Sequence, residues 1–194
     1  MGQRHLESNA ELTIDRAARR LEVEPAADVA RAAFEHAGET ATLEYGRPAA
    51  VLGAVRLACR RTDVGEPDRE RIAETFGVDP ARVVAADDLL ARSLCPPADA
   101  DEVRSLRRAL VVAQEVLAAV ERGRNAGPEL PGSHLADAAP FLLARASSHL
   151  DSRTDREFPG LDPAALRDHI ERLEADLEHA RLGTRLYVLV HRED

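Results

Sequence analysis

The sequence predicts an all-α protein, on the evidence of its composition, one helix that is apolar on nearly every side, and a series of amphipathic segments. Only 3% of the 194 residues are aromatic, whereas 44% are hydrophobic. Abundant alanine, leucine and valine favour helices packed through small side chains over a β-sandwich. In the stretch 46–61, GRPAAVLGAVRLACRR, Arg56 is the single charged residue between Pro48 and Cys59. Such a helix belongs inside a bundle, so other helices are expected to surround it.

Two amphipathic helices are predicted before this central one. Asn9 is a suitable cap for a helix over 10–21, which carries an apolar stripe on one face. A second helix over 26–37 is expected to stop at Gly38, because glycine commonly ends helices. A loop over 39–46 then leads to the central helix.

After the central helix, the sequence has the pattern of a helix-turn-helix. A short helix over 67–76 is followed by Gly77, and Asp79 is a suitable N-cap for a second helix over 80–94. The small residue Ala73 falls where the two helices would cross. An αα-corner that touches no DNA is the alternative, since this geometry also occurs as pure architecture.

The clearest break in the chain is the pair of prolines within 95–97. Consecutive prolines end one helix and delay the next, so a subdomain boundary is expected there. Apolar residues spaced alternately by three and four predict helices over 101–123 and 163–182, with another over 133–149 between them. Residues 185–191, RLYVLVH, have strand propensity and are expected to form a short extended arm.

All 26 basic residues are arginine, set against 35 Asp and Glu, which gives a formal net charge of −9. This balance suits a cytoplasm crowded with salt, so we expect a halophilic archaeal source; an ordinary acidic bacterial protein is the alternative. Residues 1–96 contain 13 arginines and 17 acidic residues, and the remainder contains 13 and 18. Neither half has a basic excess that would attract nucleic acid at low salt.

Catalytic, metal and membrane motifs are not found in the sequence. Cys59 and Cys95 belong to no CxxC pair, which excludes a zinc ribbon, and we expect both to be reduced. Asp176 and His179 lie one turn apart, but two ligands do not make a metal site. No nucleotide-binding or hydrolase motif, signal peptide or long apolar run occurs. We therefore expect a cytoplasmic protein that is not an enzyme, binds no cofactor or metal and does not enter a membrane.

Five successive segments resemble one cyclin-type repeat of archaeal transcription factor B, the relative of the eukaryotic factor IIB core domain. The segments are LTIDRAARRLEV, AADVARAAFEHA, GRPAAVLGAVRLACRR, PDRERIAETFGV and DPARVVAADDLLARSL. The resemblance is closest at the third segment and at RERIAETFGVDPARV. It implies a cyclin-like five-helix bundle over 8–95, followed over 99–194 by a C-terminal helical region with a short extended tail. That region is expected to be a helical hairpin or three-helix bundle, with a degenerate second repeat as the alternative.

In that family the fourth and fifth helices of a repeat form a helix-turn-helix that can read promoter DNA beside the TATA box, and the repeats also contact the TATA-binding protein. The resemblance therefore implies candidate DNA contacts in this chain, which are Arg69, Arg71, Arg82 and Arg92. Asp87 and Asp88, in the second helix of the motif, are expected on the same surface and would repel phosphate. The family's amino-terminal zinc ribbon is absent from the sequence.

Two functional hypotheses follow. The first is a transcription-related regulator that binds DNA or the basal transcription machinery, with the TATA-binding protein among its possible partners. The second is a protein-interaction adaptor on a cyclin scaffold that does not contact DNA. Its docking surfaces would be the heptad faces of 101–123 and 163–182 or the arm 185–191. The sequence indicates neither the DNA target nor the oligomeric state.

Overall fold

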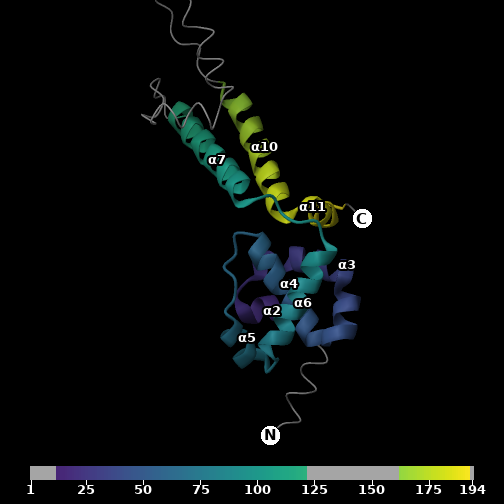
Figure 1. Cartoon of the computed structure of the whole chain (residues 1–194). Helices are drawn as coiled ribbons and strands as arrows, with labels where there is room; N and C mark the ends of the chain where they lie inside the picture. The colour runs from purple at the N-terminus through teal and green to yellow at the C-terminus, as the bar shows by residue number, and fades with distance from the viewer. Residues whose placement is uncertain (1–11, 122–161, 193–194) are drawn as a thin grey trace, which may run out of the picture. The chain divides into compact units, whose positions relative to one another are not determined.

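The computed structural model describes residues 12–121 and 162–192, and the regular secondary structure of these residues is entirely helical (Figure 1). The predicted all-α class is confirmed. Asn9 and the predicted helix over 133–149 lie outside the described residues. The chain divides into an N-terminal unit, Met1–Pro97 with Arg181–Asp194, and an inserted unit, Ala98–Ala180. The first unit thus ends beside the paired prolines, and the chain later returns to it.

The N-terminal unit contains α2 (Ile14–Leu21), the 3-10 turn η1 (Glu24–Ala26), α3 (Ala27–Tyr45), α4 (Arg47–Arg61), α5 (Arg69–Phe76), α6 (Pro80–Ser93) and α11 (Thr184–Val190). The inserted unit contains α7 (Ala100–Glu121) and most of α10 (Pro163–Leu182), whose last two residues belong to the N-terminal unit.

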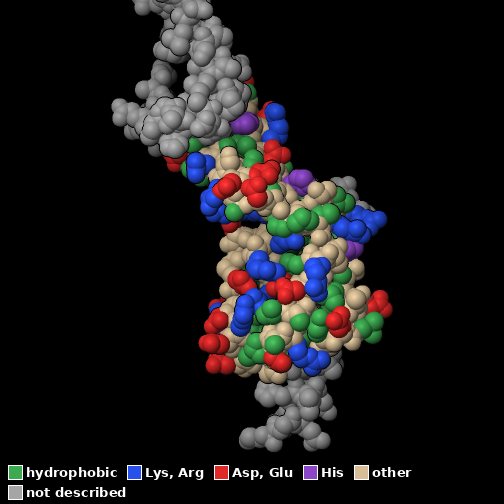
Figure 2. Space-filling model, viewed as in Figure 1, with side chains coloured by type: hydrophobic (Ala, Val, Ile, Leu, Met, Phe, Trp, Pro, Cys, Tyr) green, Lys and Arg blue, Asp and Glu red, His purple; other side chains and the backbone are tan. Residues whose placement is uncertain are grey.

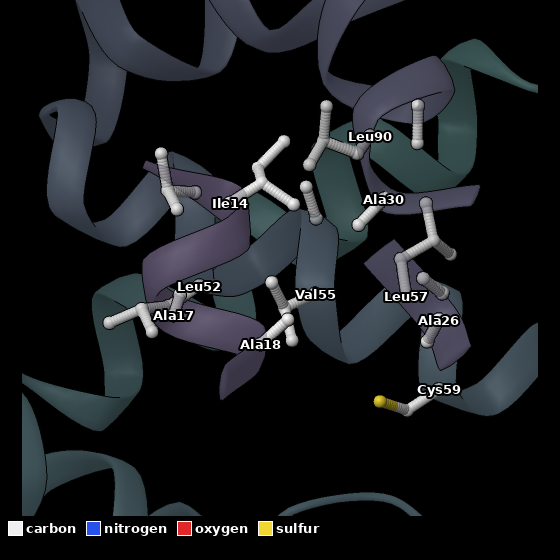
Figure 3. Packing of buried hydrophobic residues seen from close by; sticks show 14 of the residues in the cluster. Ile14, Ala17, Ala18, Ala26, Ala30, Leu52, Val55, Leu57, Cys59 and Leu90 are labelled. Carbon is white, nitrogen blue, oxygen red and sulfur yellow. The ribbon is translucent and has the colours of Figure 1, made fainter. Parts of the chain in front are cut away.

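Helix α4 is the centre of the N-terminal unit, as its composition predicts. Every residue from Ala49 to Cys59 is buried, and α4 packs against α2, α3 and α6. Figure 3 shows Leu52 and Val55 of α4 among the small side chains of α2. Alanine at so many buried positions lets the helices approach closely.

At Gly53, the backbone of α4 lies directly against the backbone of α6. A Cβ atom there would lie 2.8 Å from the backbone nitrogen of Asp87 and 3.1 Å from the carbonyl carbon of Ala86. Backbone atoms cannot move aside as a flexible side chain can. The residue at this crossing must therefore be glycine for the two helices to keep their separation.

The two helices before α4 differ from the predicted ones at their ends. Helix α2 begins at Ile14 rather than at residue 10, because the Thr13 hydroxyl accepts a hydrogen bond from the backbone N–H of Arg16, at 3.3 Å. Helix α3 does not stop at Gly38 but continues to Tyr45, and residues 39–45 are helical rather than a loop. A Cβ at Gly38 would lie 2.6 Å from the Phe34 ring, so this glycine makes room for packing.

Helices α5 and α6 are joined by the turn that the sequence predicts. Gly77 is left-handed, with φ of 64°, and its N–H donates to the carbonyl of Ala73 at 2.8 Å. The Asp79 carboxylate accepts a hydrogen bond from the N–H of Ala81 at 2.9 Å and so caps α6. Phe76 and Val83 are buried on either side of the turn.

The extended arm expected at 185–191 is instead helix α11, which packs against α3. Leu186 is fully buried, and Leu182, four residues earlier, is 1% exposed. The two leucines lie on either side of Gly183, at the end of α10 and in α11, and the burial of Leu186 outweighs the strand propensity of the segment. The C-terminal segment thus completes the core of the N-terminal unit.

Arg61, a buried arginine of α4, binds both the segment through which the chain leaves the N-terminal unit and the segment through which it returns. The Arg61 guanidinium donates to the carbonyl of Cys95, at 3.0 Å, and to the carbonyl of Leu182. Burial lowers the pKa of Arg61. Gly183 has φ of 74°, and a Cβ there would lie 2.7 Å from the carbonyl oxygens of Cys95 and Pro96. The segment leaving the unit and the segment entering it therefore share one hydrogen-bonded junction.

In the inserted unit, the predicted apolar seams of α7 and α10 pack on each other. Ala109 and Ala113 of α7 form a cluster with Ile170 and Leu173 of α10. The first and last residues of the inserted unit are also joined, since the N–H of Ala98 donates to the carbonyl of Ala180 at 2.7 Å. Within the described ranges, no helix has both the length and the apolar content that a membrane span needs.

Candidate nucleic-acid interface

The four arginines predicted as DNA contacts are all exposed, on α5 (Arg69 and Arg71) and on α6 (Arg82 and Arg92). Figure 2 shows arginine side chains interspersed with acidic ones on the visible face of the N-terminal unit. Arg71 forms a salt bridge with Glu22 at 3.0 Å, in which both side chains are largely exposed. In the part of the chain that the structure describes, the other three form no salt bridge. They remain able to donate to phosphate.

Asp87 does not face the surface that the sequence suggests. Its side chain is only 2% exposed and forms a salt bridge with Arg60 of α4. Burial raises the pKa of Asp87 to about 6, although the charge of Arg60 opposes the shift. Asp88 is exposed, so one carboxylate rather than two lies on the outer face of α6. The prediction that Asp87 shares this surface with Asp88 is wrong, because neighbouring residues on a helix point about 100° apart.

Replacing Asp87 with asparagine is expected to remove a pH dependence of stability. Because the folded-state pKa is above the unfolded value, the folded protein holds this proton between about pH 4 and 6 while the unfolded chain has lost it. The free energy of unfolding should therefore fall by about 3 kcal/mol as pH rises through this window in the wild type. Urea unfolding from pH 4 to 8 measures the difference between the two proteins; equal slopes would contradict this account.

Arg56, the single charged residue in the apolar part of α4, is buried, at 5% exposure. Its Nε donates to a carboxylate oxygen of Glu66 at 3.1 Å. Arg56, Arg60 and Arg61 are thus used within the fold, paired with Glu66, Asp87 and two backbone carbonyls. Arg56 and Arg61 are buried and do not contribute to a surface that attracts anions, while Arg60 is exposed but paired with Asp87.

The acidic excess of the sequence is not spread evenly over the two units. The described part of the N-terminal unit, 12–97 and 181–192, contains 15 arginines and 15 acidic residues. Residues 98–180 contain 10 arginines and 16 acidic residues. Over its full extent, Met1–Pro97 with Arg181–Asp194, the N-terminal unit contains 16 arginines and 19 acidic residues, so its formal charge is −3 against −6 for the inserted unit, and the returning segment contributes Arg181, Arg185 and Arg192. Dividing the sequence once, at residue 96, assigns the arginines of the returning segment to the wrong unit and so does not show this difference in charge.

The surfaces expected for an adaptor are used inside the chain. The heptad faces of α7 and α10 pack against each other, and the 185–191 segment packs on the core as α11.

Cys59 is buried and Cys95 exposed, both as free thiols. Among the described residues, no three His, Cys, Asp or Glu side chains are grouped as metal ligands. The exposed arginines on α5 and α6 remain the strongest candidate site.

Comparisons of the chain with protein-family models, with curated proteins and with solved structures find no match.

Proposed function

We propose that this protein is a transcription-related regulator that binds DNA through the helix-turn-helix of α5 and α6, with α6 toward the duplex, as its resemblance to transcription factor B implies. The observation that carries the proposal is on α6: Arg82 and Arg92 are exposed and available, while Asp87 is turned into the core and paired with Arg60. The outer face of this helix is therefore less acidic than its sequence suggests. Contact with the TATA-binding protein or another basal factor belongs to the same proposal.

The net charge of −9 is less of an obstacle to this function than it first seems. The N-terminal unit carries a formal charge of only −3, so most of the acidic excess lies in the inserted unit. If the cell is halophilic, salt further shortens the range of repulsion, since the Debye length at molar ionic strength is about 3 Å. Short-range contacts from arginine then decide whether phosphate is bound.

Labelled promoter duplexes titrated with the full chain at low and at molar KCl test the proposal directly. We expect binding detectable by fluorescence anisotropy, together with circular dichroism showing that the protein is folded in each buffer. A folded protein that binds no duplex in any of these salt concentrations would contradict DNA binding. Recovery of a nuclease-insensitive protein partner from native extract would then favour the adaptor hypothesis.

Changing Asp88 to arginine is expected to raise the affinity for duplex DNA about five- to tenfold, because it removes an exposed negative charge beside Arg92 and adds a donor. Glu24→Arg, on the exposed turn η1, is the matched control with the same change in net charge. Anisotropy titrations of the three proteins in one buffer make the comparison. Equal effects of the two substitutions would show that net charge alone is responsible and that α6 does not face DNA.

A further inference from the structure

The corner between α3 and α4 lies beside the N-terminal end of α6. Helix α3 ends at Tyr45, Gly46 turns the chain with φ of 83°, and α4 begins at Arg47. One guanidinium nitrogen of Arg82 is 3.9 Å from the position of a Cβ atom at Gly46. The side chain of Arg82 therefore extends from α6 to this corner.

The other end of the exposed face of α6 lies near the same corner. The Tyr45 hydroxyl donates a hydrogen bond to Glu44 at 2.7 Å, which is the main cause of the raised pKa of Tyr45. The charges of Arg92 and Asp88 also act on this hydroxyl, in opposite directions. Arg82 therefore lies near Gly46, and Asp88 and Arg92, about two and three helical turns after Arg82, lie near Tyr45 of the same corner.

Arg47, which directly follows Gly46, is a third arginine at the α3–α4 corner. It is exposed, and its Cζ atom lies over the Phe34 ring, 5.7 Å from the centroid. Stacking on an aromatic ring holds a guanidinium in place while leaving its N–H groups able to donate to phosphate. Like Arg82 and Arg92, Arg47 makes no salt bridge with any residue that the structure describes.

We propose that the DNA-binding surface is formed by Arg47, Arg82 and Arg92, so that the α3–α4 corner and α6 contact the phosphate backbone together. This inference rests on the proposed function and goes beyond it, because it adds Arg47 and leaves out the two arginines of α5. Arg71 is already engaged by Glu22, and Arg69 lies at the start of another helix. Three phosphate contacts from two elements position the duplex without reading its sequence.

The salt dependence of binding tests this surface in the full chain. Arg47→Gln, Arg82→Gln, Arg92→Gln and the triple variant are titrated onto a labelled duplex of mixed sequence over a series of KCl concentrations. Each lost phosphate contact reduces the slope of log K against log salt by about 1, and the triple variant should lose about 3. Arg19→Gln, an exposed arginine of α2, removes the same charge elsewhere and should leave the slope unchanged.

The outcomes separate this inference from the function on which it rests. If the wild type binds but the triple variant keeps the slope of Arg19→Gln, the surface is wrong while DNA binding stands. If Arg69→Gln lowers the slope and Arg47→Gln does not, the duplex contacts α5 instead of the corner. If the wild type binds no duplex, both proposals fail. Circular dichroism of each variant confirms folding, as the substituted side chains are all exposed.

Discussion

Replacing Gly53 with alanine is expected to lower the free energy of unfolding by about 2 kcal/mol, and replacing it with valine by more. The added Cβ would lie 2.8 Å from a backbone nitrogen of α6, so the two helices must separate. Alanine is otherwise the better helix former by about 1 kcal/mol, and at an open helical site the same change would stabilise the protein. Urea unfolding measures the sign and size of the effect.

Gly65 provides the matched control for this prediction. A Cβ at Gly65 meets no atom within 4 Å, so Gly65→Ala should change the free energy of unfolding by no more than about 0.5 kcal/mol. If Gly53→Ala instead stabilises the protein to the extent that helix propensity predicts, then α4 and α6 do not cross as closely as described.

Replacing Arg61 with leucine is expected to destabilise the protein by about 3 kcal/mol. Leucine retains apolar volume but leaves the carbonyls of Cys95 and Leu182 without their shared donor in a buried place. The loss should be greatest for the C-terminal segment, so hydrogen exchange at Leu186 should accelerate along with the fall in global stability.

Arg69→Leu serves as the control, because Arg69 is exposed and its removal should change stability by no more than about 0.5 kcal/mol. An Arg61→Leu protein as stable as the control, with Leu186 equally protected, would show that the junction does not hold α11. Gly183→Ala is an independent probe of the same junction, because it introduces a Cβ 2.7 Å from two carbonyl oxygens.

The features that the sequence predicts well depend on local signals. Helix α4 is recognised because a helix apolar on every side has only one stable environment. The turn before α6 is recognised because Gly77 and Asp79 supply a left-handed residue and a cap at the right spacing. For these residues, chain neighbours a few positions apart determine the conformation.

The features that the sequence predicts poorly depend on contacts between distant residues. Gly38 looks like a helix stop, but its role is set by the Phe34 ring that covers it, and the helix continues. The 185–191 segment looks like a strand, but burial of Leu186 against a helix over 100 residues earlier decides its conformation. The conformational preference of a short segment is overridden where tertiary packing contributes more to the free energy of folding.

For the candidate site, the sequence identifies exposed arginines but not their surroundings. The pairing of Asp87 with Arg60 joins two helices, and nothing in the local sequence indicates it. Arg47 was missed because it is the first residue of a helix already assigned to the core. Arg82 reaches Gly46, the residue before Arg47, only because the α3–α4 corner lies beside α6.

The return of the chain to its first unit has a consequence during synthesis. After α6 emerges from the ribosome, roughly 90 further residues must be translated before Leu182 and Leu186 are available, which takes about 5–19 s at typical elongation rates. Throughout this interval the nascent bundle lacks α11, and the apolar side of α3 that α11 covers stays open to solvent. The core of this unit is therefore completed only after the inserted unit has been made, and until then its apolar surface is accessible to chaperones.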